Sequence, residues 1–124
     1  MRLFSFFALV FVILCGSAKE GRAARYSGDY LLQMCAVNKE GQELVKGGKI
    51  ACQAYISGIL DYHALLKSLD VEPPGIDFCV PEDVGLNLLQ LRLMNYLIKN
   101  REAQGPYIAS PNVSLALREM YPCK

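Results

Sequence analysis

The chain has 124 residues, with 13 basic and 12 acidic side chains and a formal net charge of +1. This balance excludes the strongly positive surface that nucleic-acid-binding domains use, so no nucleic-acid partner is expected. The length suits one compact domain, and no repeat or low-complexity segment divides it.

Residues 1–18 have the pattern of an export signal. Met1 and Arg2 give a short basic start, and residues 3–15 form an apolar run interrupted only by Ser5. The run is shorter than the about 20 residues that span a bilayer as a helix, and small residues follow it, as a signal peptidase requires. We therefore expect cleavage after residue 18, with residue 23 as the alternative limit.

The four cysteines behind this signal are Cys35, Cys52, Cys79 and Cys123. An even number of cysteines in an exported chain predicts two disulfides, formed in an oxidising compartment outside the cytosol. The cysteines are too widely spaced for a structural zinc site, and the chain has one histidine, so no metal or other cofactor is expected. Residues 19–27 are predicted to be a flexible N-terminal segment and residues 28–124 the folded domain, with no further run able to span a membrane.

Helical periodicity dominates the first half of the domain. Residues 28–37 place apolar side chains on one face, and Ser27 or Asp29 can accept a hydrogen bond from the amides at the start. Residues 38–48 hold three glycines and are predicted to be a loop. A central helix over 49–68 is predicted from a continuous apolar stripe of Cys52, Tyr55, Ile59, Tyr62, Leu66 and Leu69.

Two more helices are predicted after a break at residues 73–75, which are Pro-Pro-Gly. Pro81 and the two acidic residues after it suit a first helical turn, so the third helix is placed over 81–100. Ser110 and Pro111 are read as the cap and first residue of a fourth helix, which Pro122 ends. One face of the third helix is marked by Val84, Leu88, Leu91, Asn95 and Ile98, with Met94 and Leu97 beside it.

Antiparallel packing of these helices selects one of the three possible disulfide pairings. The start of one helix then lies beside the end of the next, so Cys79 can meet Cys123, and Cys35 and Cys52 can join the first two helices. The expected fold is an all-α, four-helix domain stapled by two disulfides. On the chain-entropy account the two bridges contribute about 3 and 4 kcal/mol.

Four segments in this order resemble a known family: Gly28–Cys35, Cys52–Asp61, Cys79-Val80-Pro81 and Ala116–Cys123. Together they resemble the Rap/Tai family of type VI secretion amidase immunity proteins. The resemblance implies a homodimeric periplasmic protein that neutralises a peptidoglycan amidase effector by binding it.

The side chains offer no catalytic set. His63 is predicted to lie on a water-facing flank beside Asp61 and Lys67, and the cysteines are expected to be oxidised, so we expect no enzyme activity. Asp61 has no matched acid or metal partner and is read as structural. Gly58 costs about 1 kcal/mol relative to alanine in a helix, which predicts a close helix contact or a dimer crossing.

The segment 99–110 is the candidate partner-binding element. Arg101, Glu102, Gln104 and Tyr107 lie between two helices that disulfides would hold, and Tyr and Arg are enriched among interface hot spots. We expect this segment to occlude an effector's substrate cleft, although an ordinary helix connector needs no partner. The alternative function is a periplasmic acid-stress chaperone or another non-enzymatic helical binding module.

Overall fold

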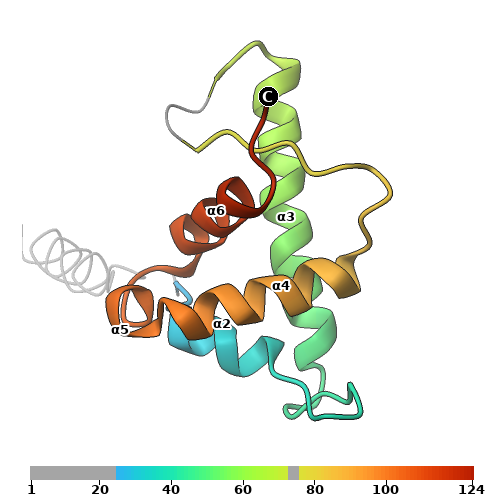
Figure 1. Cartoon of the computed structure of the whole chain (residues 1–124), viewed down its shortest axis with the longest axis vertical. Coiled ribbons are helices and arrows are strands. Elements are labelled where there is room, and N and C mark those ends of the chain that lie inside the picture. The colour runs from blue at the N-terminus through green and yellow to red at the C-terminus, as the bar shows by residue number, and fades with distance from the viewer. Residues whose placement is uncertain (1–24, 73–75) are drawn as a thin grey trace, which may run out of the picture.

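The computed structural model describes residues 25–72 and 76–124. Within them the fold is all-α, as predicted, with two isolated bridges and no β-strand. The helices are α2 (Gly28–Cys35), α3 (Gly48–Ser68), α4 (Leu86–Lys99), α5 (Arg101–Gln104) and α6 (Ala109–Met120). The long helix α3 is the central element, and α2, α4 and α6 pack against it (Figure 1). The predicted signal peptide lies outside the described residues.

Helix α2 begins as predicted and ends earlier. The Ser27 hydroxyl accepts a hydrogen bond from the Tyr30 amide at 3.1 Å, which satisfies one free donor of the first turn. The predicted extension to residue 37 is wrong, because Ala36 adopts extended backbone and Val37 forms a bridge with Glu43.

Helix α3 matches the predicted central helix, but its apolar stripe is not buried along its whole length. Cys52 and Ile56 are fully buried, whereas Tyr62 and Leu69 are each 63% exposed. The C-terminal half of α3 extends past α2 and α4 (Figure 1), so fewer elements cover it. The prediction of one continuous core stripe is therefore wrong for the last turns.

Helix α4 corrects two predictions. It begins at Leu86 and not at Pro81, because residues 82–83 form a turn and the Val84 amide donates to the Pro81 carbonyl. Its core face is also not the predicted one: the buried side chains are Leu89, Gln90, Leu93 and Leu97. The helix carries a second apolar face, and spacing alone could not say which of the two meets the core.

The described residues hold five helices instead of four, because the predicted connector contains the short helix α5. Helix α6 starts at Ala109 and has no side-chain cap, so the predicted capping role of Ser110 is wrong. Its inner face buries Ala109, Asn112, Val113, Ala116 and Leu117.

Both predicted disulfides are confirmed. Cys35–Cys52 ties the end of α2 to the first turns of α3, and Cys79–Cys123 ties the segment before α4 to the chain after α6. The first bridge is completely buried beside Leu31 and Ile56 in the hydrophobic core. One covalent link therefore ties α2 to α3, and the other ties the two ends of the segment that contains α4, α5 and α6.

Candidate partner-binding site

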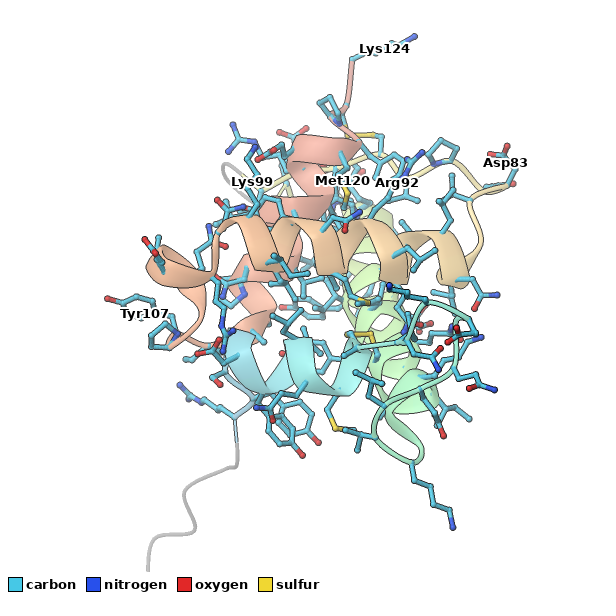
Figure 2. All side chains as sticks on the ribbon, turned by 60° about the horizontal axis from the view of Figure 1, so that its bottom comes forward. Asp83, Arg92, Lys99, Tyr107, Met120 and Lys124 are labelled. Carbon is cyan, nitrogen blue, oxygen red and sulfur yellow. A yellow bond between two sulfur atoms is a disulfide. The ribbon has the colours of Figure 1, made fainter. Side chains whose placement is uncertain are left out.

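The four residues predicted to bind a partner lie together on one projecting turn. Arg101, Glu102 and Gln104 belong to α5, and Tyr107 follows it. We call residues 101–108 the α5 loop. Tyr107 is 67% exposed and points away from the bundle at its outer edge (Figure 2).

Backbone hydrogen bonds fix the α5 loop to the start of α2. The Gly28 amide donates to the Tyr107 carbonyl at 2.8 Å, and the Asp29 amide donates to the Gly105 carbonyl at 2.9 Å. A third bond runs from the Ala109 amide to the Tyr26 carbonyl at 2.8 Å. The loop therefore has a defined path although its tip is exposed.

Close packing at Gly105 sets the same path. A β-carbon at this buried residue would lie 2.6 Å from the Arg101 carbonyl oxygen and 2.8 Å from the Asp29 carboxylate. Both distances are too short for van der Waals contact, so a larger residue would have to displace the loop from α2. The Gly105-Pro106 pair was a visible turn signal, but its packing partner on α2 was not.

Asn112 on α6 supports the loop from inside. It is buried, and its side-chain nitrogen donates to the Gln104 carbonyl at 2.8 Å. A buried amide that is paired in this way contributes about 1 kcal/mol, and leaving the carbonyl unpaired would cost more. The sequence alone does not indicate this role, because nothing local to Asn112 points to the Gln104 carbonyl.

The four candidate residues differ in what they do within the chain. The Arg101 side chain donates to the Asp29 carboxylate, and the Gln104 side chain donates to the Tyr96 hydroxyl at 3.2 Å. Glu102 and Tyr107 are exposed. The geometry thus separates two side chains that hold the loop from two that it presents.

The Rap1a immunity protein family model matches residues 27–123, which include every described helix and both disulfides. The chain belongs to the Rap1a immunity protein family. No curated protein and no solved structure matches it. Family membership points to an immunity role against a secreted effector and to a non-enzymatic mode of action.

In this Rap1a family member, His63 does not lie on a water-facing flank, so that prediction is wrong. Its side chain is 13% exposed, its Nε2 lies 2.8 Å from Asp77 Oδ1, and its ring stacks on Phe78 with centroids 3.9 Å apart. The segment 76–78 folds back over α3 and covers the histidine. We call His63, Lys67, Asp77 and Phe78 the clasp.

Asp77 is the charged centre of the clasp. Lys67 Nζ donates to its second carboxylate oxygen at 3.0 Å. The hydrogen bond from Lys67, followed by the one from His63, holds the pKa of Asp77 below its usual range. No group of three or more His, Cys, Asp or Glu in the described residues could hold a metal ion.

A groove of about 530 Å³ runs between α3 and α6 beside the clasp. Its walls are mainly apolar and include Tyr62, Leu66, Ile76, Phe78 and Leu115. Gly58 borders it, and a β-carbon there would meet nothing within 4 Å. The predicted close helix contact at Gly58 is therefore wrong within the described residues, while a dimer crossing stays a prediction.

None of the described helices has the length and apolar character needed to cross a membrane.

Proposed function

We propose that this Rap1a family protein is exported to the periplasm and acts there as a homodimer. It binds a peptidoglycan amidase delivered by type VI secretion and blocks the substrate cleft of that enzyme with the α5 loop. The observation that carries the proposal is the exposed Tyr107 on a loop fixed to α2 by backbone hydrogen bonds.

Occlusion by a loop requires that the loop already has its bound shape. Each flexible side chain that becomes ordered on binding costs about 0.5–1.5 kcal/mol, and ordering a mobile backbone costs more. The backbone hydrogen bonds from Gly28 and Asp29 already order the loop backbone in the free protein, so most of this ordering cost does not arise on binding. Tyr107 adds a large contact area with only two rotatable side-chain bonds.

The disulfides support the proposed location. Both bridges are formed, and such bonds persist in oxidising compartments, which include the bacterial periplasm. The export signal predicted at residues 1–18 supplies the route out of the cytosol.

Inhibition assays with purified peptidoglycan amidases of type VI secretion systems test the proposal directly. We expect the wild-type protein to stop peptidoglycan hydrolysis, and Tyr107→Ala to weaken binding by roughly 30-fold or more, as for a hot-spot tyrosine. Leu44→Ala, which truncates an exposed apolar residue far from the α5 loop in sequence, is the control. Full inhibition by Tyr107→Ala would assign the contact to another surface.

The clasp favours a second candidate function, an acid-stress chaperone. Protonation of Asp77 in strong acid would remove the carboxylate between His63 and Lys67 and loosen Phe78 from α3. The apolar groove, which Phe78 lines, would then widen and take up unfolded clients. Suppression of client aggregation at a pH of about 2–3 tests this function. No suppression there, together with amidase inhibition at neutral pH, would reject it.

A further inference from the structure

Helix α4 has a second apolar face that the core does not use. Leu88, Leu91 and Ile98 are 42%, 49% and 56% exposed. Both figures show α4 lying across the front of the domain with no other helix over it (Figures 1 and 2). Together with the exposed Asn95, these residues form what we call the α4 seam.

The spacing of the α4 seam is that of a two-helix interface. Its residues follow one another at intervals of three, four and three, which are the a and d positions of a heptad repeat. The buried side chains of α4 occupy the opposite b, c and f positions. One helix thus meets the core with one face and offers a coiled-coil stripe on the other.

Asn95 suggests what occupies the stripe. It stands at an a position and makes no side-chain hydrogen bond to the described residues. A single asparagine at an a position sets the register of a two-stranded pair by facing its own counterpart. A second copy of α4 in parallel orientation supplies that counterpart.

The charges on α4 agree with the parallel orientation. Arg92 and Lys99 stand at e positions, and Leu86–Lys99 contains no acidic residue. In an antiparallel pair with residue 98 opposite residue 88 of the other copy, Arg92 would lie closest to Arg92 of that copy, and like charges repel. In a parallel pair each e position faces a g position, which here is Asn87 or Met94. The arrangement therefore avoids repulsion in one orientation only.

We propose that the α4 seam pairs in parallel with the α4 seam of a second copy, with the two Asn95 side chains facing each other. This inference rests on the homodimer in the proposed function and specifies its surface. Because α5 begins directly after α4, the two α5 loops of such a dimer lie at the same end of the assembly.

Sedimentation equilibrium of the disulfide-bonded protein tests the seam. We expect a dimer for the wild type, and Leu91→Glu should raise the dimer dissociation constant by about 100-fold or more, because it buries an unpaired charge. The matched control is Leu69→Glu on α3, where the leucine is 63% exposed and outside the seam. It should leave the dimer intact.

Cross-linking tests the orientation without depending on the charge variants. Ile98→Cys should form a disulfide-linked dimer under mild oxidation only in the parallel pair. In an antiparallel pair residue 98 lies opposite residue 88 of the other copy, about 15 Å from its own counterpart. Leu69→Cys is the control and should remain unlinked.

Three results would overturn the inference. A dimer broken by Leu69→Glu and not by Leu91→Glu would leave the homodimer standing and reject the seam. A wild-type monomer at all concentrations would reject both the seam and the homodimer, while amidase inhibition could still be measured. Loss of amidase binding by Leu91→Glu with the dimer unchanged would assign α4 to the effector.

Discussion

Arg101 on α5 donates a hydrogen bond to Asp29 on α2, with 2.7 Å between Nε and Oδ1, although 72 positions separate the two residues in sequence. The pair connects the presented loop to the helix that the Cys35–Cys52 bridge holds. It therefore couples the tip of the candidate binding site to the covalently tied part of the fold.

Removing this pair should affect binding more than stability. The Arg101 and Asp29 side chains are 62% and 38% exposed, and such surface ion pairs contribute less than about 1 kcal/mol. We expect Asp29→Asn to lower the free energy of unfolding by less than that amount while weakening effector binding. Urea unfolding and calorimetric binding measure the two effects. If Asp29→Asn binds the effector as tightly as the wild type does, the backbone hydrogen bonds alone are enough to hold the α5 loop in place.

Two glycine substitutions should act in opposite directions. Gly105→Ala forces a β-carbon against the Arg101 carbonyl and should lower the free energy of unfolding by about 1–3 kcal/mol. Gly58→Ala adds a methyl group to open space inside a helix and should raise it by about 0.5–1 kcal/mol. Urea unfolding of the two variants checks both signs. If Gly58→Ala instead lowered the free energy of unfolding of the monomer, the added methyl group would have to meet a neighbour that the structure does not place near Gly58.

The clasp predicts how stability depends on pH. Lys67 first and His63 second lower the pKa of Asp77 in the folded state, so the folded protein prefers the carboxylate. This stabilisation is fully present above the unfolded pKa of about 3.9 and is lost as pH falls through the lower folded value. We expect Asp77→Asn to be less stable than the wild type at pH 7 and equally stable in strong acid.

Urea unfolding between pH 2 and pH 7 measures this difference. Asp61→Asn is a matched control, because it neutralises an exposed carboxylate on α3 outside the clasp. Its stability should follow the wild-type curve at every pH. A constant difference between Asp77→Asn and the wild type across this range would contradict the assigned role of the carboxylate.

The two disulfides should contribute unequally. The bridges close loops with sequence separations of 17 and 44 residues, so the chain-entropy account gives about 3 kcal/mol for Cys35–Cys52 and about 4 kcal/mol for Cys79–Cys123. Paired Cys→Ser variants, measured by urea unfolding, test the order. If the Cys35–Cys52 variant loses more, core packing around its buried sulfurs outweighs loop closure.

Helix periodicity was sufficient to find the four longer helices but not their exact ends or the short α5, because three- and four-residue spacing is clear only over several turns. It failed on α4, where Leu88 and Leu91 repeat as regularly as the buried Leu89 and Leu93. Only the three-dimensional packing decides which of two apolar faces meets the core. If the α4 seam pairs with a second copy, the predicted face of α4 is buried in the dimer interface and not in the core of its own domain.

The sequence named four residues of the α5 loop but not the residues elsewhere in the chain that hold this loop in place. Tyr107 and the loop around it could be chosen from residue type and position between helices. The support from Asp29 joins positions 72 residues apart, and the bond from Asn112 to Gln104 connects two different helices, so no helix periodicity encodes either pair. The clasp could not be predicted for the same reason, because His63 and Asp77 belong to different segments of the chain.

Gly105 and the backbone bonds to α2 determine the path of the α5 loop, and neither involves the side chains of Glu102 or Tyr107. These two positions can therefore accept other residues at little cost in folding free energy. A lineage facing a changed toxin could alter its recognition by substitutions at the tip alone. If the α5 loop contacts the effector as proposed, this scaffold separates the evolution of specificity from the maintenance of the fold.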